Sequence, residues 1–300
     1  MTQHAPAALV FLDPDHVDGR LADPNAPQIL VTDEGLTRGD GVFETMLAVD
    51  GRVRKIQSHL NRLASSANIC SLPIPHETQW KRAIDLAVST LAEQHPQFRE
   101  MTVKLTATRG VPGQGSTCWV LATAVPEETI RQRENGIDVI LLDKGHDAKA
   151  NHRAPWLLMG AKTLSYAVNM SALRYAKSRG KHDVIFHTSE GRVLEGPTST
   201  VLMAKIPSDG GTPKLITPRL ETGVLPGTTQ GAIFKGAEAQ GWELGYGPVM
   251  CQELLEMDAV WLVSSVRLIT PVLSLDSQPM NTYPELTNQL TEFLLAGDAG

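Results

Sequence analysis

Lys162 is the first residue whose surroundings suggest chemistry. It lies between small residues in the stretch Gly160-Ala161-Lys162-Thr163-Leu164-Ser165-Tyr166, just after the apolar run Pro155-Trp156-Leu157-Leu158-Met159. We therefore expect its side chain to emerge from a partly buried place. Because an ammonium is costly to bury, such a lysine needs a counter-charge, a lowered pKa or a Schiff base with a carbonyl compound. An ordinary lysine at a helix start fits the same residues, and Lys162 alone does not separate the two interpretations.

The stretch Gly223-Val224-Leu225-Pro226-Gly227-Thr228-Thr229 is a candidate anion site, because it precedes a predicted helix over residues 228–240. A helix start offers unpaired N–H groups and the positive end of a dipole, which suits a phosphate. The two threonine hydroxyls add donors, and Gly227 lets a ligand approach the backbone closely. A plain threonine cap is the other interpretation. No GxxxxGK[ST] motif is present, so this is not a Walker phosphate loop.

Three further positions each have a functional and a structural interpretation. Arg62 is a natural phosphate partner or a solvated arginine on a helix that also carries Leu60 and Leu63. Glu195 follows a strand and could pair with a cationic ring nitrogen or face water. Ser264 and Ser265 end an apolar strand, where their hydroxyls could line a site or cap the next turn.

The histidines and cysteines give no sign of a metal site or of disulfides. His182 and His187 are five residues apart on a predicted strand and so point to opposite faces, and the nine histidines form no HExxH motif. Cys70, Cys118 and Cys251 are far apart without a CxxC pair. We expect no bound metal and reduced thiols in a cytoplasmic protein.

Length and composition indicate a globular protein of two domains, which we place at residues 1–130 and 131–300. The chain has 300 residues, 42% of them hydrophobic and 20% charged. Its net charge of −6, with no basic cluster, predicts no nucleic-acid partner. No apolar stretch approaches the ~20 residues that a membrane helix needs, and we expect no signal peptide.

Local patterns predict mixed α and β structure in both halves. An Asp50-Gly51 turn joins strands over residues 42–49 and 52–56, a helix capped by Ser58 covers residues 59–67, and a second helix covers residues 80–94. Two strands, 101–108 and 118–125, follow. The polar segment Pro126–Gly136 is the predicted linker. The second half has predicted strands at 137–142, 183–187, 192–194, 200–204, 214–216 and 259–264. Its predicted helices are one that follows Lys162 and runs through Tyr175, one over 228–240 and one over 284–295.

Taken together, these residues resemble the class IV pyridoxal-phosphate enzymes, which include branched-chain aminotransferases, D-amino-acid aminotransferases and aminodeoxychorismate lyases. The resemblance runs from about Leu36 to Val272 and keeps the order of the family's motifs. It implies a mixed α/β, two-domain fold of type IV, with a smaller N-terminal α+β domain and a larger C-terminal domain with a β-barrel-like core. The matching segments are Gly39-Asp40-Gly41-Val42-Phe43-Glu44-Thr45, His59-Leu60-Asn61-Arg62-Leu63, Lys162, Glu195, Leu225-Pro226-Gly227-Thr228-Thr229 and Ser264-Ser265.

The resemblance implies pyridoxal 5′-phosphate as cofactor and gives each matching residue a role. Lys162 would form the Schiff base and then act as general base and acid. Glu195 would keep the ring nitrogen protonated. The other cofactor-binding residues would be Arg62, Gly227, Thr228, Thr229, Ser264 and Ser265 around the phosphate and Leu225 on the ring. Members of the family are usually homodimers acting on small amines, and we expect the same here.

The resemblance does not fix the substrate. D-amino-acid aminotransferases carry Arg-x-His after a Thr-Arg-Gly strand end, whereas here Gln114 and Ser116 follow Thr108-Arg109-Gly110. The overall likeness to actinobacterial members favours a 4-amino-4-deoxychorismate lyase, which releases pyruvate and forms 4-aminobenzoate for folate synthesis. A transaminase for branched-chain or D-amino acids and a non-catalytic phosphate-binding protein are the alternatives. Arg38 and Arg109 are candidates for substrate carboxylates or for structural ion pairs.

Overall fold

Contacts divide the chain into two units, which we call the first unit (Met1–Pro126 with Ala161–Tyr166) and the second unit (Glu127–Gly160 with Ala167–Gly300). The computed structural model describes residues 5–209 and 211–298. The ends of the two predicted domains, residues 1–4 and 299–300, lie outside the described residues. The predicted division after residue 130 stays a prediction.

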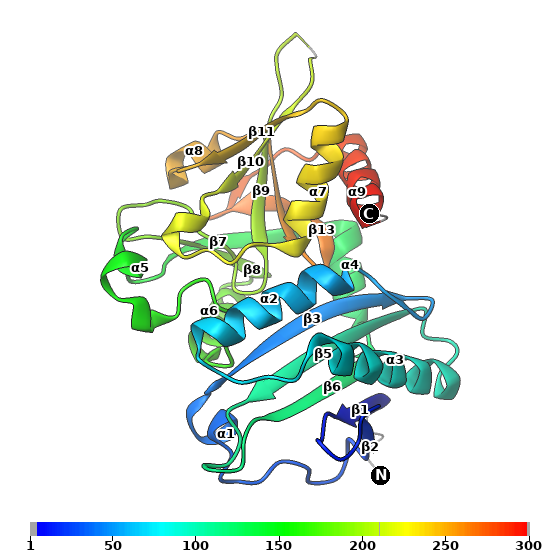
Figure 1. Ribbon diagram of the computed structural model, residues 1–300. Coiled ribbons are helices and arrows are strands. Elements are labelled where there is room, and N and C mark those ends of the chain that lie inside the picture. Colours follow the sequence, from blue (N-terminus) through cyan, green and yellow to red (C-terminus); the bar gives the residue numbers. More distant parts are fainter. Residues whose placement is uncertain (1–4, 210, 299–300) are drawn as a thin grey trace. The chain divides into compact units, whose positions relative to one another are not determined.

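The first unit is built on an antiparallel sheet of six strands in the order β2-β1-β6-β5-β3-β4 (Figure 1). Its strands are β1 (Ala7–Phe11), β2 (Arg20–Ala22), β3 (Gly41–Val49), β4 (Arg52–Val53), β5 (Glu100–Thr108) and β6 (Thr117–Ala124). Its helices are α1 (Glu34–Arg38), α2 (Ile56–Ile69) and α3 (Glu77–Gln94). Helices α2 and α3 pack on one face of the sheet, in a core that includes Leu63, Trp80 and Val103.

The expected hairpin and the second expected helix are confirmed. Asp50 and Gly51 both have positive φ angles, 47° and 77°, as a tight hairpin turn requires. Helix α3 begins with a capping box between His76 and Gln79, and its predicted apolar face is buried. The residues of that face are Ala83, Ile84, Ala87, Val88 and Leu91.

Strands β3 and β5 present different residues on the two faces of the first sheet. Val42 and Met46 of β3 and Val103 and Leu105 of β5 join the core under the helices. Side chains alternate along a strand, so Phe43 points to the opposite face. The two strands pair along their whole length, from Gly41 with Thr108 to Val49 with Glu100.

The second unit is built on a mixed, curled sheet of eight strands in the order β11-β10-β9-β12-β13-β7-β8, with β14 paired to β13. Its strands are β7 (Ile137–Asp143), β8 (Asp183–His187), β9 (Thr200–Lys205), β10 (Lys214–Pro218), β11 (Glu243–Gly247), β12 (Ala259–Ser264), β13 (Leu268–Leu275) and β14 (Gln278–Pro279). Its helices are α4 (Glu127–Asn135), α5 (Ala150–Arg153), α6 (Ala167–Ser178), α7 (Thr228–Ala239), α8 (Cys251–Leu255) and α9 (Pro284–Asp298), with short 3-10 turns at Pro155–Leu157 and Leu220–Thr222.

Several apolar clusters pack against the second sheet. Helices α7 and α9 lie side by side and cover one face, where Gly236 leaves room for the backbone of Phe293 (Figure 1). A separate cluster takes Val139 from β7, Ile185 from β8 and Leu262 from β12, together with residues of β9 and β13. The strands therefore curl around a common apolar interior, as expected for a barrel-like core.

Two local expectations are wrong. Helix α2 begins at Ile56 after Lys55, so Ser58 lies inside the helix and does not cap it. Pro126–Gly136, expected as a linker, is mostly helix α4, since Arg131 pairs with Glu127 and Glu128 at helical spacing. The helix expected after Lys162 is confirmed as α6, which begins at Ala167, and Lys162 precedes it in an extended segment.

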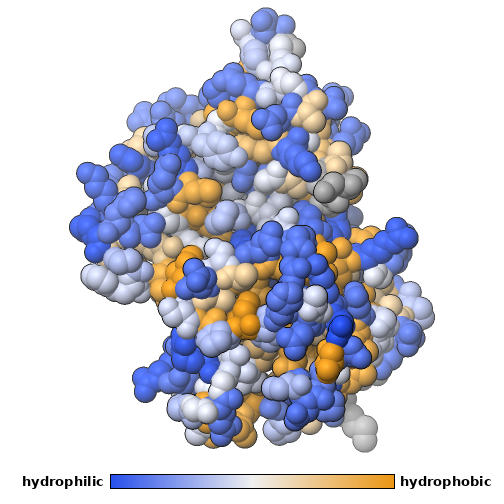
Figure 2. Space-filling model, in the orientation of Figure 1, coloured by the Kyte–Doolittle hydropathy of each residue, from blue (hydrophilic) through white to orange (hydrophobic). Residues whose placement is uncertain are grey.

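No helix in the described part of the chain is long and apolar enough to cross a membrane. On the face shown in Figure 2, hydrophilic side chains predominate and apolar side chains form smaller patches.

Candidate active site

Backbone hydrogen bonds on both sides of Lys162 hold it beside the start of β3. The N–H of Phe43 donates to the carbonyl of Lys162 at 3.0 Å, and the N–H of Leu164 donates to the carbonyl of Gly41 at 2.8 Å. The N–H of Lys162 itself donates to Oγ of Ser66, on α2, at 3.1 Å. This lysine therefore lies on an ordered extended segment that is tied to both a strand and a helix of the first unit.

The side chain of Lys162 lies against two aromatic rings. Its Nζ is 4.4 Å from the ring centre of Phe43 and 5.7 Å from that of Tyr166. The two rings meet edge to face with centres 5.3 Å apart. Lys162 is half-buried, as the sequence predicts. An aromatic wall supports a cation through its ring electrons and at the same time removes water from around the amine.

Arg62 is held by a buried carboxylate on the neighbouring strand. Its Nε and Nη2 donate to the two oxygens of Glu44 at 2.6 Å and 2.8 Å. Nδ1 of His59 lies 2.7 Å from Oε2 of Glu44, and because an ionised carboxylate only accepts, the imidazole donates. The side chains of Glu44 and His59 have no exposed surface, and that of Arg62 is 11% exposed.

The charge states of this trio follow from its burial and its contacts. Burial by itself would raise the pKa of Glu44, but the charge of Arg62 and the hydrogen bonds from Arg62 and His59 outweigh it and lower the pKa to about 2. Burial lowers the pKa of His59 despite the opposing effect of Glu44. An ionised Glu44 between Arg62 and a neutral His59 is consistent with both directions.

Arg62 and Lys162 are brought together within the first unit. Arg62 and Ser66 are one turn apart on α2, and Ser66 holds the backbone of Lys162. Phe43 and Glu44, adjacent on β3, contact Lys162 and Arg62 respectively.

In the second unit, helix α7 begins at the predicted anion-binding turn. Gly227 is its N-cap and makes no side-chain cap hydrogen bond. A Cβ at this position would lie 2.3 Å from Oγ1 of Thr200, so only glycine fits. The hydroxyls of Thr228 and Ser265 share a hydrogen bond of 3.2 Å, and Thr229 is buried. The fold thus places the Ser264-Ser265 turn beside the start of α7.

Glu195 and Leu225 are also neighbours in the second unit. Oε2 of Glu195 accepts a hydrogen bond from the N–H of Leu225 at 3.1 Å. The carbonyl of Glu195 accepts from the N–H of Phe186 at 2.9 Å, which fixes Glu195 beside β8. Ser264 has a local role, since its Oγ accepts from the N–H of Arg267 at 3.2 Å.

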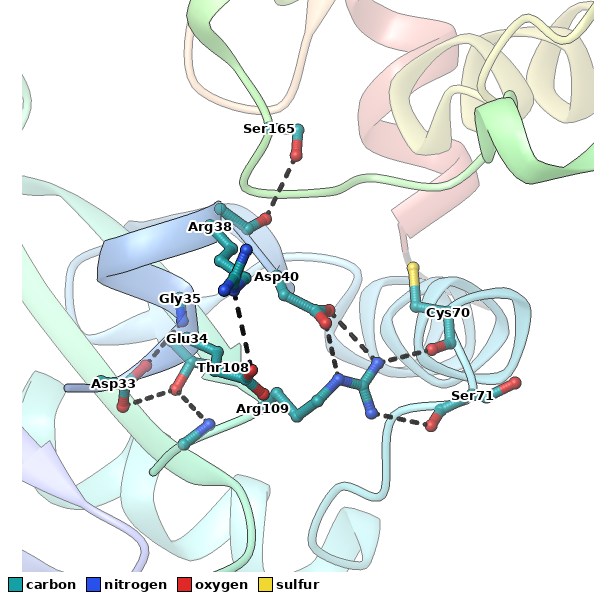
Figure 3. Close-up of polar contacts among 12 residues, drawn as sticks. Asp33, Glu34, Gly35, Arg38, Asp40, Cys70, Ser71, Thr108, Arg109 and Ser165 are labelled. Atoms are coloured by element: carbon teal, nitrogen blue, oxygen red, sulfur yellow. Dashed lines mark hydrogen bonds and ion pairs between the residues drawn. The ribbon is translucent and has the colours of Figure 1, made fainter. Parts of the chain in front are cut away.

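Of the two arginines suggested for substrate carboxylates, Arg109 is held by other residues of the first unit and Arg38 is largely exposed (Figure 3). Arg109 donates to both oxygens of Asp40, at 2.6 Å and 3.2 Å, and to the carbonyls of Cys70 and Ser71. The geometry therefore favours the structural ion pair for Arg109. The side chain of Arg38 is 75% exposed and lies 4.0 Å from Glu34.

Sequence reasoning pointed to Lys162 and to the residues expected around a phosphate, but it did not point to the side chains that contact them. Phe43, Glu44 and His59 lie inside the recognised motifs, yet nothing in their spacing shows which side chain each one contacts. No sequence pattern pointed to a role for Ser66 or Tyr166. Their roles depend on the pairing of residues 161–166 with β3, which joins parts of the chain far apart in sequence.

The second unit also contains a cavity of about 570 Å³ that the sequence did not suggest. Basic and acidic side chains line it, among them Lys149, Arg192, Arg219, Glu190 and Glu221. None of the residues proposed for the cofactor lines this cavity.

Comparison with known proteins identifies the class to which this fold and this set of residues belong. Residues 41–275 match the amino-transferase class IV family, and the chain belongs to that family. Among its relatives is the bifunctional aminodeoxychorismate lyase / D-amino acid transaminase of Mycobacterium tuberculosis, which is 38% identical over 94% of this chain and 98% of the relative.

Solved structures agree with this assignment. A fold IV transaminase of Curtobacterium pusillum superimposes with a TM-score of 0.88 at 39% identity, covering 97% of this chain and 99% of the other. A hypothetical aminotransferase of Mycobacterium tuberculosis, in its pyridoxal-phosphate-bound form, gives a TM-score of 0.88 at 37% identity over 97% and 98% of the two chains. The expected type IV fold and the family are confirmed, and with them the expectation of an enzyme.

Proposed function

We propose that this protein is a pyridoxal-phosphate-dependent 4-amino-4-deoxychorismate lyase. One observation carries the proposal: Lys162 is a half-buried amine against Phe43 and Tyr166, on a segment tied through Ser66 to the helix of Arg62. The Mycobacterium tuberculosis relative supports the choice of reaction, because its name includes aminodeoxychorismate lyase. Membership of the family excludes the non-catalytic interpretation.

The residues of each unit fit the cofactor. In the first unit, Arg62 is a buried, oriented cation of the kind that binds phosphate. In the second unit, α7 starts at a glycine where no side chain fits, next to the hydroxyls of Thr228 and Ser265. Glu195 offers a carboxylate beside Leu225 for a protonated ring nitrogen. Thr229, Ser264 and Gly227 complete the proposed set of cofactor-binding residues.

The proposed reaction needs an electron sink and a residue that moves a proton. Bound pyridoxal phosphate draws electrons from the carbon that bears the substrate amine. Nζ of Lys162 takes the proton from that carbon, and pyruvate leaves as the ring becomes aromatic. The rings of Phe43 and Tyr166 keep water away from Nζ. Arg62, held by Glu44, would bind the phosphate of the cofactor and so fix its position relative to Lys162.

Transamination is the second candidate function. The same relative is named a D-amino acid transaminase as well as a lyase, and a transaminase structure superimposes on nearly the whole chain. In this reaction Lys162 would move the proton between two carbons instead of allowing pyruvate to leave. The absence of Arg-x-His after Arg109 argues against a D-amino-acid aminotransferase of the usual kind.

We further propose a homodimer that works in the cytoplasm and serves folate synthesis. Exposed apolar side chains such as Trp156, Leu157 and Val168 on the second unit are consistent with a covered surface in the assembly.

The test is a substrate panel with the purified protein and pyridoxal phosphate. We expect 4-amino-4-deoxychorismate to yield 4-aminobenzoate and pyruvate without any amino acceptor, and Lys162→Ala to yield neither. The second arm supplies D-alanine or a branched-chain amino acid with 2-oxoglutarate. Amine transfer that depends on a keto acid, with no 4-aminobenzoate formed in the first arm, would show that the protein is a transaminase and not a lyase.

A further inference from the structure

The cavity of about 570 Å³ in the second unit has no part in the proposed function. Four segments that are separate in sequence form its wall: residues 148–153 with α5, the turn at 190–193, the turn at 219–222 and residues 247–248 at the end of β11. Pockets for small ligands commonly have volumes of about 300–1,000 Å³, so this cavity has room for a small organic molecule.

Hydrogen bonds join the segments of this wall to one another. The N–H of Ala148 donates to Oε2 of Glu190 at 3.2 Å, which connects the segment of α5 to the turn at 190–193. Nε of Arg219 donates to the carbonyl of Tyr246 at 3.0 Å, which connects the turn at 219–222 to β11. The wall is therefore held together by the protein's own contacts and does not need a ligand to form.

Positive side chains outnumber negative ones around the cavity. Its lining residues include four permanent cations and two carboxylates, namely Lys149, Arg153, Arg192 and Arg219 with Glu190 and Glu221. This balance is opposite to that of the whole chain, which has a net charge of −6. Because clustered charges of one sign in a hollow attract ligands of the other sign, the cavity favours an anion.

Three of the four cations can donate to a ligand. Arg153 is held by Asp147, with an N–O distance of 2.8 Å. The side chains of Lys149 and Arg192 have neither an ion pair nor a hydrogen bond with any residue in 5–209 or 211–298. Within the same described ranges, Arg219 uses only its Nε, so both of its terminal nitrogens can still donate.

The two carboxylates restrict the kind of anion that fits. Glu190 already accepts from the N–H of Ala148, whereas the side chain of Glu221 has no polar contact in the described part of the chain. A carboxylate repels a bare anion but accepts hydrogen bonds from hydroxyl groups. The cavity therefore suits a molecule that has an anionic group at one end and hydroxyl groups elsewhere.

We propose that this cavity binds a small phosphorylated molecule, with its phosphate among Lys149, Arg192 and Arg219. A phosphate monoester has a charge of about −1.5 to −2 at neutral pH and three acceptor oxygens, which match the three cations able to donate. Glu221 accepts from a hydroxyl group on the rest of the ligand, as in a sugar phosphate. The inference does not depend on the proposed function, since none of the residues proposed for the cofactor lines the cavity.

Protection of Lys149 from acetylation tests the position of the phosphate directly. The pyridoxal-phosphate-treated protein is acetylated briefly at increasing concentrations of inorganic phosphate, and each lysine is followed by peptide mass mapping. Phosphate should slow the acetylation of Lys149 several-fold and leave Lys235, an exposed lysine on α7, unchanged. Potassium chloride at the same ionic strength screens charges without filling the cavity, so it should not protect Lys149.

Substitutions at exposed arginines show whether the cavity is the binding site. Arg192→Met and Arg219→Met should each raise the phosphate concentration needed for protection roughly tenfold, since a hydrogen bond between charged groups is lost. Both side chains are exposed, so the variants should fold. Arg174→Met, at an exposed arginine on α6 that does not line the cavity, is the control and should behave as wild type.

A hydroxylated probe tests the part given to Glu221. Glycerol 3-phosphate should protect Lys149 at lower concentrations than inorganic phosphate does. Glu221→Gln removes a repelling charge and should strengthen protection by inorganic phosphate, which narrows the difference between the two probes. Equal protection by both probes in the wild-type protein would overturn the contact between Glu221 and a hydroxyl group.

The phosphate site as a whole is overturned by either of two results. In the first, neither phosphate compound protects Lys149 better than potassium chloride does. In the second, Arg192→Met and Arg219→Met both leave the protection unchanged. Failure of the proposed function would look different, because the protein would then show no cofactor absorbance band and no turnover, whatever the acetylation of Lys149.

Discussion

Glu44 is the buried residue that holds Arg62, the proposed phosphate partner in the first unit. It is the buried anion that orients Arg62, and it accepts a hydrogen bond from His59 as well. An arginine held through two of its nitrogens cannot rotate freely, so its position is set before any ligand arrives. The sequence motif around Glu44 is therefore explained by the arginine it holds.

Replacing Glu44 with glutamine should destabilise the protein strongly. Removing one partner of a buried ion pair costs about 3–5 kcal/mol, because the other charge stays buried without compensation. Chemical denaturation at neutral pH should show a loss of this size in the free energy of unfolding. Glu238→Gln, at an exposed position on α7, is the control and should change little. Equal stability of the two variants would contradict the role given to Glu44.

The ion pair between Glu44 and Arg62 also predicts how the stability of the protein depends on pH. The pKa of Glu44 falls from its ordinary value of 4.5 to about 2 on folding, so its ionised form stabilises the folded state. That stabilisation is fully present above about pH 4.5 and is lost as the pH falls through about 2. The stability difference between wild type and Glu44→Gln should be constant near neutral pH and shrink below pH 4.5. A difference that grows on acidification would contradict the assignment.

Helix α7 is the element that carries the residues proposed to bind the phosphate in the second unit. Its start is shaped by Gly227, where a Cβ would collide with Thr200. Gly231, one turn later, has nothing within 4 Å of such a Cβ. The two glycines therefore provide a matched pair on one helix.

Gly227→Ala should weaken pyridoxal-phosphate binding roughly tenfold or more, because the helix start must move and its dipole no longer meets the phosphate in the same place. Gly231→Ala should bind the cofactor as wild type does. Fluorescence titration with pyridoxal phosphate, and with pyridoxal as the form lacking a phosphate, measures both. An equal effect of Gly227→Ala on the two compounds would show that this turn does not bind the phosphate.

Elements with strong local patterns could be predicted, and those defined by distant pairing could not. Helix α3 and the β3–β4 hairpin follow from apolar spacing and an Asp-Gly turn. Strand β13 has no counterpart among the predicted strands, because Pro271 breaks the usual pattern of a paired strand. The segment around Lys162 looks like a helix start from its sequence, yet its pairing with Gly41 and Phe43 keeps it extended.

At the scale of the whole molecule, family membership accounts for the order of motifs along the chain, while the substrate has to be read from individual side chains. A fold shared by lyases and transaminases does not select between them. The sequence suggested Arg38 and Arg109 as partners for the substrate carboxylate. The structure shows each of them beside a carboxylate of its own unit. The position of Lys104 beside the ring of Phe43 is one such detail, because it depends on the strand register and not on any local sequence pattern.

We predict that the whole molecule is a homodimer. Light scattering should give twice the mass of one chain. Trp156 is 74% exposed, and if its surface is covered in the assembly, Trp156→Glu should shift the protein toward the monomer. Leu220→Glu, at another exposed apolar residue of the second unit, serves as a comparison. A wild-type protein of single-chain mass at all concentrations would contradict the prediction.

The central claim is that Lys162 carries the cofactor, and borohydride reduction followed by peptide mass mapping tests it most directly. Reduction should remove the visible absorbance band and leave pyridoxal phosphate attached to the peptide that contains Lys162. Lys162→Ala should show neither the band nor the label. A label on Lys104, the other lysine beside Phe43, or no label on the wild-type protein after treatment with pyridoxal phosphate, would contradict the account.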